Sequence, residues 1–338
     1  MMPREYDESD VRIRPGRGSR PRTKRRPDHA DAEEAMVTVV DRGRWTCAPG
    51  GDPGRPPVTA MRARELGRTP IVVGDRVGLV GDLSGAPDTL ARIVRVEERR
   101  TLLRRTADDT DAFERVVVAN ADRLVIVTAV ADPEPRTGFV DRCLVAAYAG
   151  GLQPVLCLTK ADLGDPAPFA EHYADLEFPV VVTRRGDHPT ALAELLEGKV
   201  SALVGHSGVG KSTLVNALVP DAVQRTGVVS GVGKGRHTTV AAIALPLEDG
   251  WVVDTPGVRS FGLAHVTPDA VIAAFDDLAT AVEDCPRGCG HLGPPADPEC
   301  ALDALVAAGG SRPGRLGALR RVLVALRAAP PGAAPTER

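Results

Sequence analysis

The chain has 338 residues, enough for two or three domains, and its hydrophobic fraction of 43% and charged fraction of 26% are ordinary for a soluble globular protein. No apolar run approaches the ~18 residues that a membrane span requires, and no basic segment followed by an apolar one marks a secretory signal. We therefore expect a cytoplasmic protein with no membrane partner. The net charge of −3 does not by itself indicate a nucleic-acid partner, but the charge is unevenly placed.

Residues 1–35 are predicted to form a disordered arm with a strongly basic segment. Eight basic residues and no acidic residue lie between Val11 and Arg26, and Gly and Pro interrupt any helix there. Such an arm can neutralise phosphates and steer the protein onto nucleic acid. A solvated tail with no partner is the alternative, and we favour nucleic-acid contact.

Residues 36–105 consist of short strand patterns separated by Gly, Pro and Asp turns, which is typical of a small β-barrel. The expected strands cover 36–40, 58–64, 76–80, 90–96 and 101–104. We favour a barrel of the oligonucleotide-binding (OB) type. The segment lacks the aromatic residues of a base-stacking surface, so any RNA contact should depend on Arg side chains and loop geometry. A purely structural barrel is the alternative.

Residues 110–264 alternate between strand and helix patterns, which predicts an α/β domain with a mostly parallel sheet and helices on both faces. The expected strands cover 123–129, 154–158, 179–183 and 200–204, and the expected helices cover 140–149, 167–176 and 191–196. Two further strands, 239–245 and 250–253, are expected to be antiparallel to each other.

The strand at 200–204 leads into a complete phosphate-binding loop, G-x-x-x-x-G-K-[ST], and a helical pattern follows. Glycines let the backbone wrap around phosphate oxygens, and the helix presents its positive N-terminal end to the same anion. Lys211 should reach the β- and γ-phosphates, and the Ser212 hydroxyl should bind Mg²⁺. The loop comprises Gly205, His206, Ser207, Gly208, Val209, Gly210, Lys211, Ser212 and Thr213, of which we interpret His206 as filling the loop.

A base-recognition segment, Thr159-Lys160-Ala161-Asp162, follows the strand at 154–158 and differs by one residue from N-K-x-D. The Asp162 carboxylate can accept hydrogen bonds from N1–H and the 2-amino group of guanine together, a pairing that adenine cannot offer. The stem of Lys160 would lie over the base plane. Thr159 replaces Asn, and its hydroxyl offers one hydrogen-bonding group where an amide offers two.

Asp254-Thr255-Pro256-Gly257 fits D-x-x-G at the end of a strand. Asp254 should hold Mg²⁺ through water, and the amide of Gly257 should face the γ-phosphate. Either Thr238 or Thr239, at the end of a glycine-rich loop, should bind Mg²⁺ when the γ-phosphate is present. The sequence leaves the choice between these two open.

The base-recognition segment precedes the phosphate-binding loop, whereas ordinary GTPases have the reverse order. A circularly permuted domain can build the same site. Val258 stands near the position where many GTPases have a Gln that orients the attacking water. We therefore consider His237 as the catalytic residue, with an exposed loop His of no role as the alternative, and we expect slow hydrolysis without a partner.

Residues 265–328 are predicted to form a zinc-binding helical domain. Cys285, Cys289, His291 and Cys300 lie within 16 residues, and three thiols with one imidazole suit a tetrahedral structural zinc site. Free cytosolic thiols are the alternative. Residues 315–327 predict an amphipathic helix whose arginines, Arg315, Arg320, Arg321 and Arg327, form either an RNA-facing surface or a solvated face. Residues 329–338 are predicted to be a disordered tail.

Together, these segments resemble the circularly permuted, small ribosomal subunit-dependent GTPases of the RsgA/YjeQ family. The resemblance rests on the order of barrel, TKAD, GHSGVGKST, GRHTT, DTPG and Cys/His cluster, and covers about 36–310. It implies an enzyme that binds rRNA and acts in late maturation of the small (30S) subunit, with GTP hydrolysed to GDP and phosphate when the subunit stimulates it. It also implies zinc at the Cys/His cluster, Mg²⁺ with GTP, and catalysis by His237. We expect a monomer.

Three features depart from the family pattern: Thr159, the spacing of the zinc ligands, and the basic arm, which extends beyond the family core.

Two other functions are consistent with parts of the sequence. A P-loop ATPase or kinase would bind ATP as well as GTP. A nucleotide-gated RNA-binding scaffold, in which hydrolysis is incidental, would support subunit maturation in cells even if its hydrolysis were removed.

Overall fold

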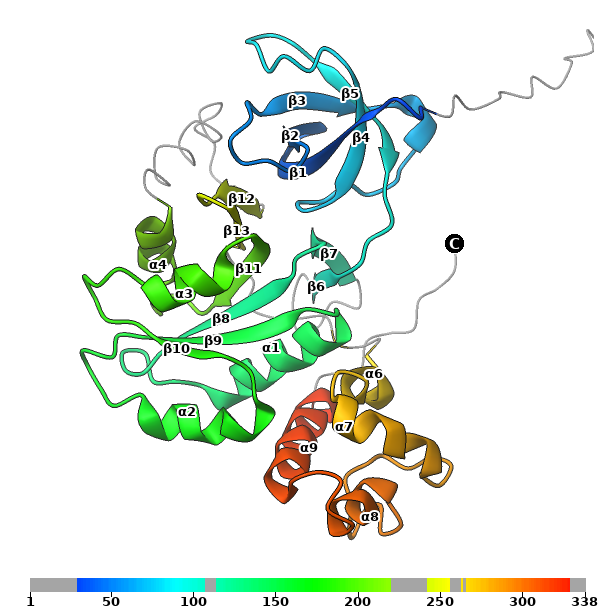
Figure 1. Cartoon of the computed structure of the whole chain (residues 1–338), viewed down its shortest axis with the longest axis vertical. Coiled ribbons are helices and arrows are strands. Elements are labelled where there is room, and N and C mark those ends of the chain that lie inside the picture. The colour runs from blue at the N-terminus through cyan, green and yellow to red at the C-terminus, as the bar shows by residue number, and fades with distance from the viewer. Residues whose placement is uncertain (1–28, 107–113, 220–241, 256–262, 264–265, 329–338) are drawn as a thin grey trace, which may run out of the picture.

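The computed structural model describes residues 29–106, 114–219, 242–255, 263 and 266–328. A β-barrel, an α/β domain and a helical C-terminal region follow one another along the chain (Figure 1). Within the described residues, no helix combines the length and apolarity that crossing a membrane would need.

Five strands close the N-terminal barrel. β1 pairs with both β2 and β4, β5 joins β4 to β3, and β2 pairs with β3, so the barrel has no free edge. Side chains that alternate along these strands fill the interior, among them Val37, Leu79 and Ile93. The expected OB-type barrel is confirmed. Its strands are β1 (Glu33–Asp41), β2 (Arg44–Pro49), β3 (Val58–Arg62), β4 (Arg76–Gly81) and β5 (Ala91–Val96), with a 3-10 turn at Arg64–Leu66.

One strand assignment needs correction. The segment 101–104, expected as the last barrel strand, belongs to β6 (Leu102–Thr106), which pairs with β7 (Glu114–Ala119) in a separate two-stranded sheet. The closed barrel has no edge left for it, and Leu103 instead packs into the core of the α/β domain. Two strands, β2 and β7, were not expected at all.

The α/β domain contains a six-stranded section of sheet in the order β10-β9-β8-β11-β13-β12, in which only β12 is antiparallel to its neighbour. Helices α1 and α2 cover one face, and α3 and α4 cover the other (Figure 1). The elements are β8 (Arg123–Ala129), α1 (Thr137–Ala149), β9 (Gln153–Thr159), α2 (Ala167–Tyr173), η3 (Ala174–Leu176), β10 (Val180–Val182), α3 (Thr190–Leu196), β11 (Lys199–Gly205), α4 (Lys211–Leu218), β12 (Ile243–Pro246) and β13 (Gly250–Asp254).

The barrel is joined directly to this sheet. β1 pairs with β12 at Val39 and Ile243, so the barrel and the α/β sheet are continuous through their hydrogen bonds. The indole N–H of Trp251, on β13, donates to the carbonyl of Gly51 at 2.9 Å. The β12–β13 hairpin therefore belongs to the α/β domain and also contacts the barrel.

The C-terminal region is helical and packs against α1. Its elements are α6 (Pro268–Ile272), α7 (Asp276–Ala279), η4 (Thr280–Asp284), α8 (Ala301–Ala307) and α9 (Pro313–Arg327). The apolar face of α9, including Leu319 and Leu323, is buried in the core shared with α1.

The four arginines of α9 contact other parts of the chain. The contacts run from Arg315 to Asp277 and Glu177, from Arg320 to Asp303, from Arg321 to the carbonyl of His172, and from Arg327 to the carbonyl of Gly290. These side chains therefore connect α9 with α7, α8, the loop that carries Gly290 and the α/β domain, while Arg327 itself stays exposed. A role in contacting RNA stays a prediction.

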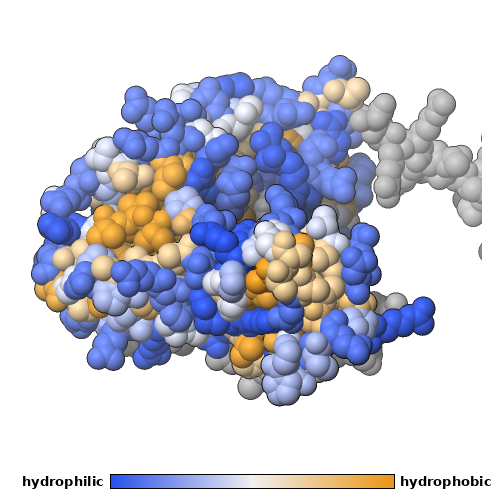
Figure 2. All heavy atoms as spheres, turned by 60° about the horizontal axis from the view of Figure 1, so that its bottom comes forward, coloured by the Kyte–Doolittle hydropathy of each residue, from blue (hydrophilic) through white to orange (hydrophobic). Residues whose placement is uncertain are grey.

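The surface is mostly hydrophilic on the face shown in Figure 2, and hydrophobic residues gather there in two areas separated by hydrophilic ones. Among the described residues, the large hydrophobic side chains that remain exposed come from all three parts of the chain: Met61, Leu90, Leu163, Val182 and Val324. Isolated side chains of this kind are normal on soluble proteins.

A substitution at Gly74 should show how closely the barrel approaches β7. Gly74 has φ +87°, and an added Cβ would lie 1.9 Å from the carbonyl oxygen of Ala119. Gly43 is the matched control, because its φ is +84° but a Cβ there would meet nothing within 4 Å. We expect Gly74→Ala to lower the free energy of unfolding in urea by about 1–3 kcal/mol more than Gly43→Ala does. Equal losses would contradict the close approach.

Candidate nucleotide site and metal centre

The phosphate-binding loop connects β11 to α4, as the sequence predicts. Gly208 and Gly210 have φ of +85° and +91°, a conformation that side chains rarely adopt. Gly210 is the N-cap of α4 and carries no side chain that could cap the helix. The first N–H groups of α4 therefore remain available to an anion, and the helix dipole favours negative charge at the same place.

Two charged residues beside the phosphate-binding loop, Lys211 and Asp254, contact each other. Lys211 Nζ forms an ion pair with Asp254 Oδ1, and both side chains are partly buried. β11 and β13 are neighbouring parallel strands with Leu203 opposite Asp254, so the start of α4 lies next to the end of β13. The hydroxyl of Thr255 donates to the carbonyl of Leu203 at 2.6 Å and fixes the chain where it leaves β13.

Thr159 connects the base-recognition segment to the phosphate-binding loop. Its hydroxyl is buried and donates to the carbonyl of Val209; the carbonyl of Thr128 lies further away, at 3.3 Å. A hydroxyl has only one proton to donate, so the bond to Val209 accounts for it. Thr159 thus keeps a link to the loop with a shorter side chain than the Asn of N-K-x-D.

Asp162 is held by the loop that follows β10. Its Oδ1 accepts a hydrogen bond from the amide of Arg185 at 3.1 Å. This amide and the amide of Asp162 itself, and after them the positive charges of Arg185 and Arg184, lower the pKa of Asp162 below its ordinary value. The carboxylate is therefore ionised at neutral pH, as an acceptor for two donors of a guanine ring must be.

Lys160 has φ +58° and its Nζ donates to the carbonyl of Asp132. Ala161 contributes its amide, which donates to the carbonyl of Thr183 at 3.2 Å. These two hydrogen bonds, one from a side chain and one from the backbone, fix the base-recognition segment between the loops after β8 and β10.

One cavity of about 880 Å³ brings the two segments together. Thr159, Lys160 and Asp162 line one part of it, and the phosphate-binding loop lines another. Of that loop, Gly205, His206, Ser207, Gly208, Gly210, Lys211, Ser212 and Thr213 line the cavity, whereas Val209 is buried beneath it. The ring of His206 packs on Phe139 of α1, with centroids 4.1 Å apart.

The sequence interpretation missed part of the cavity wall. Thr183, Arg184, Arg185, Gly186 and Asp187 follow β10 and line the cavity beside Asp162. The signal that could have found them is positional, because ligands bind outside the carboxyl ends of the strands in open α/β sheets. A loop that follows the strand next to β9 belongs in that region whatever its side chains.

His237, Thr238, Thr239 and Gly257 lie outside the described residues, as does Val258. Their expected roles therefore stay predictions.

The Cys/His cluster comes together in the C-terminal region. Cys285, Cys289, His291 and Cys300 offer one ligand atom each, and these atoms all lie within 4.8 Å of one another. The cysteines form no disulfide. Three sulfurs and an imidazole at this spacing fit a single metal ion with tetrahedral coordination.

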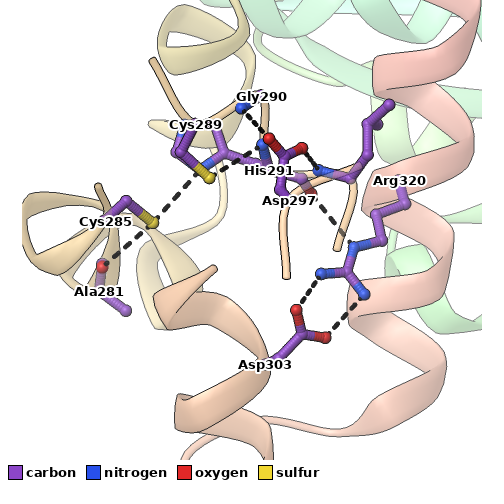
Figure 3. A network of polar contacts seen from close by, with 9 residues as sticks. Ala281, Cys285, Cys289, Gly290, His291, Asp297, Asp303 and Arg320 are labelled. Atoms are coloured by element: carbon purple, nitrogen blue, oxygen red, sulfur yellow. Dashed lines mark hydrogen bonds and ion pairs between the residues drawn. The ribbon is translucent and has the colours of Figure 1, made fainter. Parts of the chain in front are cut away.

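Side chains around the cluster hold the loop that carries His291 (Figure 3). Asp297 accepts hydrogen bonds from the amides of Gly290 and Leu292 at 2.9 and 2.8 Å, and these two bonds lower the pKa of Asp297. Arg320 donates to the carbonyl of His291 and forms a two-bond ion pair with Asp303. The loop geometry therefore depends on α8 and α9 as well as on the ligands.

Comparisons with known proteins agree with this arrangement. Residues 96–264, half of the chain, match the model of a family described as RsgA GTPase. The chain is 39% identical over 257 residues to "Small ribosomal subunit biogenesis GTPase RsgA" of Gemmatimonas aurantiaca, over 74% of this chain and 82% of that protein.

Two solved structures are also similar. The crystal structure of YjeQ from Thermotoga maritima has a TM-score of 0.63 and 27% identity, covering 88% of this chain and 99% of that one. The structure of YloQ, described as a circularly permuted GTPase, has a TM-score of 0.63 and 22% identity, covering 89% of this chain and 96% of that one; this likeness shows the fold.

The hydroxyl at residue 159 can be tested with a shape-matched pair of variants. Thr159→Val removes the donor and leaves the buried carbonyl of Val209 without a partner, which costs about 1–3 kcal/mol. We expect guanine-nucleotide affinity, measured by titration calorimetry, to fall by about tenfold or more. Thr159→Ser keeps the hydroxyl and should stay within about threefold of the wild type. If the Thr159→Val variant bound guanine nucleotide as tightly as the Thr159→Ser variant, the hydrogen bond to Val209 would not support the site.

Proposed function

This chain belongs to the RsgA family of GTPases, and we propose that it acts in late maturation of the small ribosomal subunit by binding rRNA and hydrolysing GTP to GDP and phosphate. The observation that carries the proposal is one cavity in which an ionised carboxylate, Asp162, and a phosphate-binding loop lie together. Its relative from Gemmatimonas aurantiaca bears the name of a small-subunit biogenesis GTPase.

The nucleotide would be held at both ends of this cavity. Asp162 would accept the N1–H and 2-amino donors of guanine, and the amides of the phosphate-binding loop with Lys211 would bind the phosphates. Lys211 contacts Asp254 directly, so binding of a triphosphate requires Lys211 to turn from this carboxylate towards the phosphates. Asp254 would then be free to hold Mg²⁺ through water, together with the hydroxyl of Ser212.

The remaining roles extend the proposal to parts that lie outside the described residues. Thr238 or Thr239 would complete the Mg²⁺ site, the amide of Gly257 would face the γ-phosphate, and His237 would orient the attacking water. We place zinc at the Cys₃His cluster, where full protein ligation makes it structural. We propose a monomer in the cytoplasm whose basic arm contacts rRNA.

Guanine recognition by Asp162 can be tested by a substitution that changes which hydrogen-bond donors and acceptors the side chain at residue 162 offers to the base. Asp162→Asn replaces one acceptor oxygen with an N–H donor, which fits xanthine, whose 2-carbonyl replaces the 2-amino group of guanine. We expect nucleotide competition to show GTP affinity lowered by at least about tenfold and XTP affinity raised. Asp165→Asn, an exposed carboxylate three residues further on, is the control and should leave the preference for GTP unchanged.

The pH dependence of the same contact has a definite sign. The lowered pKa of Asp162 keeps the carboxylate charged around neutral pH, so the preference for GTP over ATP should be constant there. It should weaken in acid, as pH falls through that lowered pKa, and in alkali, where guanine N1–H loses its proton. Equal binding of ATP and GTP at neutral pH would contradict guanine recognition and favour a P-loop ATPase or kinase.

Stimulation by the ribosomal subunit is measured as GTP turnover with and without purified small subunits. We expect the subunits to raise turnover by at least about tenfold. His237→Ala should reduce the stimulated rate by about 10²–10⁴-fold without weakening GTP binding, whereas His172→Ala, at an exposed position on α2, should change neither. Absence of stimulation would count against the function, and normal subunit maturation in cells carrying His237→Ala would favour the scaffold.

A further inference from the structure

The two ring nitrogens of His291 face different groups. Nδ1 lies 3.5 Å from the sulfur of Cys285, inside the Cys₃His cluster. Nε2 lies 3.4 Å from Oδ1 of Asp269, which is outside the cluster and belongs to α6. The side chain of His291 is only 4% exposed, whereas that of Asp269 is 74% exposed, so a buried ring meets a carboxylate at the surface of α6.

We propose that Asp269 is a positioning residue for the metal centre, and that the metal binds His291 through Nδ1. A neutral imidazole carries its proton on one nitrogen and offers the lone pair of the other. A carboxylate beside Nε2 favours the proton there, which leaves the lone pair of Nδ1 directed at the thiols. Outer carboxylates of this kind fix the tautomer and the ring orientation of metal-binding histidines.

The backbone of His291 is held by other groups, so the role of Asp269 concerns the ring. His291 has φ +60°, and its carbonyl accepts a hydrogen bond from Nε of Arg320 at 3.1 Å (Figure 3). Asp297 binds the amides on either side of it. These contacts act on the backbone at His291 and not on its ring nitrogens, and the Asp269 carboxylate lies beside Nε2.

The contact also connects the metal centre to a particular helix. Asp269 is in the first turn of α6, which is capped by the hydroxyl of Thr267 and buries Val271 and Ile272 in the core shared with α1 and α9. α6 is the first described helix that follows Asp254 in the chain. Metal binding should therefore stabilise the part of the C-terminal region that is nearest in sequence to the nucleotide site.

The experiment measures zinc affinity directly, with full-length protein, by equilibrium competition against a chromogenic chelator. Asp269→Ala should lower the affinity by about 10–100-fold, the usual effect of losing such a partner. Asp269→Asn keeps a side-chain oxygen that can accept the Nε2 proton and should lose less than Asp269→Ala. Asp276→Ala removes an exposed carboxylate from α7 and should match the wild type.

Two further measurements separate positioning from folding. The chelator-treated variants should unfold at the same temperature as the chelator-treated wild type, because the contact acts through the metal. Long-range ¹H–¹⁵N correlation spectra of the zinc-loaded protein should show His291 protonated at Nε2 and bound through Nδ1.

A zinc affinity of Asp269→Ala within about twofold of the wild type would overturn the proposal, as would zinc bound through Nε2 or a wild type that binds no zinc. An unfolding temperature lowered equally with and without metal would assign Asp269 to helix stability alone. None of these outcomes depends on GTP hydrolysis or on a ribosomal partner.

Discussion

Hydrogen bonding between parallel strands brings together the chain segments that carry the candidate nucleotide-binding residues. β8, β9, β10, β11 and β13 run in the same direction, so their carboxyl ends meet at one edge of the sheet. The register places Gly205 opposite Val127, and Asp254 opposite Leu203. Because the site requires strand ends in a given spatial order, and not a given order along the chain, the permuted domain can build it.

The parts of the site that depend on a short stretch of chain could be predicted from the sequence. The phosphate-binding loop is one such part, because its glycines, lysine and flanking elements are all local. The loop at 183–187 could not, because it contributes through the amide of Arg185 and through its position beside Asp162. Every residue other than proline has a backbone amide, so the side chains of this loop do not mark the amide of Arg185 as part of the site. Only the position of the loop, which follows from the order of the strands, does so.

Local features of the fold could likewise be predicted from the sequence, whereas pairings between distant segments could not. The strand at 123–129 is a continuous buried run, and its predicted limits match β8. The pairing of β6 could not be read from its own residues, because it depends on the barrel having closed without it and on β7 being available. The arginines of α9 show a periodic pattern in the sequence, yet their partners on α7, α8 and the metal-ligand loop are distant along the chain.

The pairing of β1 with β12 has a consequence for the behaviour of the protein in a crowded solution. An unpaired edge strand presents a row of N–H and C=O groups that can template association with other chains. In the described sheet, the barrel covers the β12 edge, and the opposite edge is β10, a strand of only three residues. The barrel thus protects the α/β sheet from edge-to-edge aggregation, and a chain that lacked the barrel would expose β12 to it.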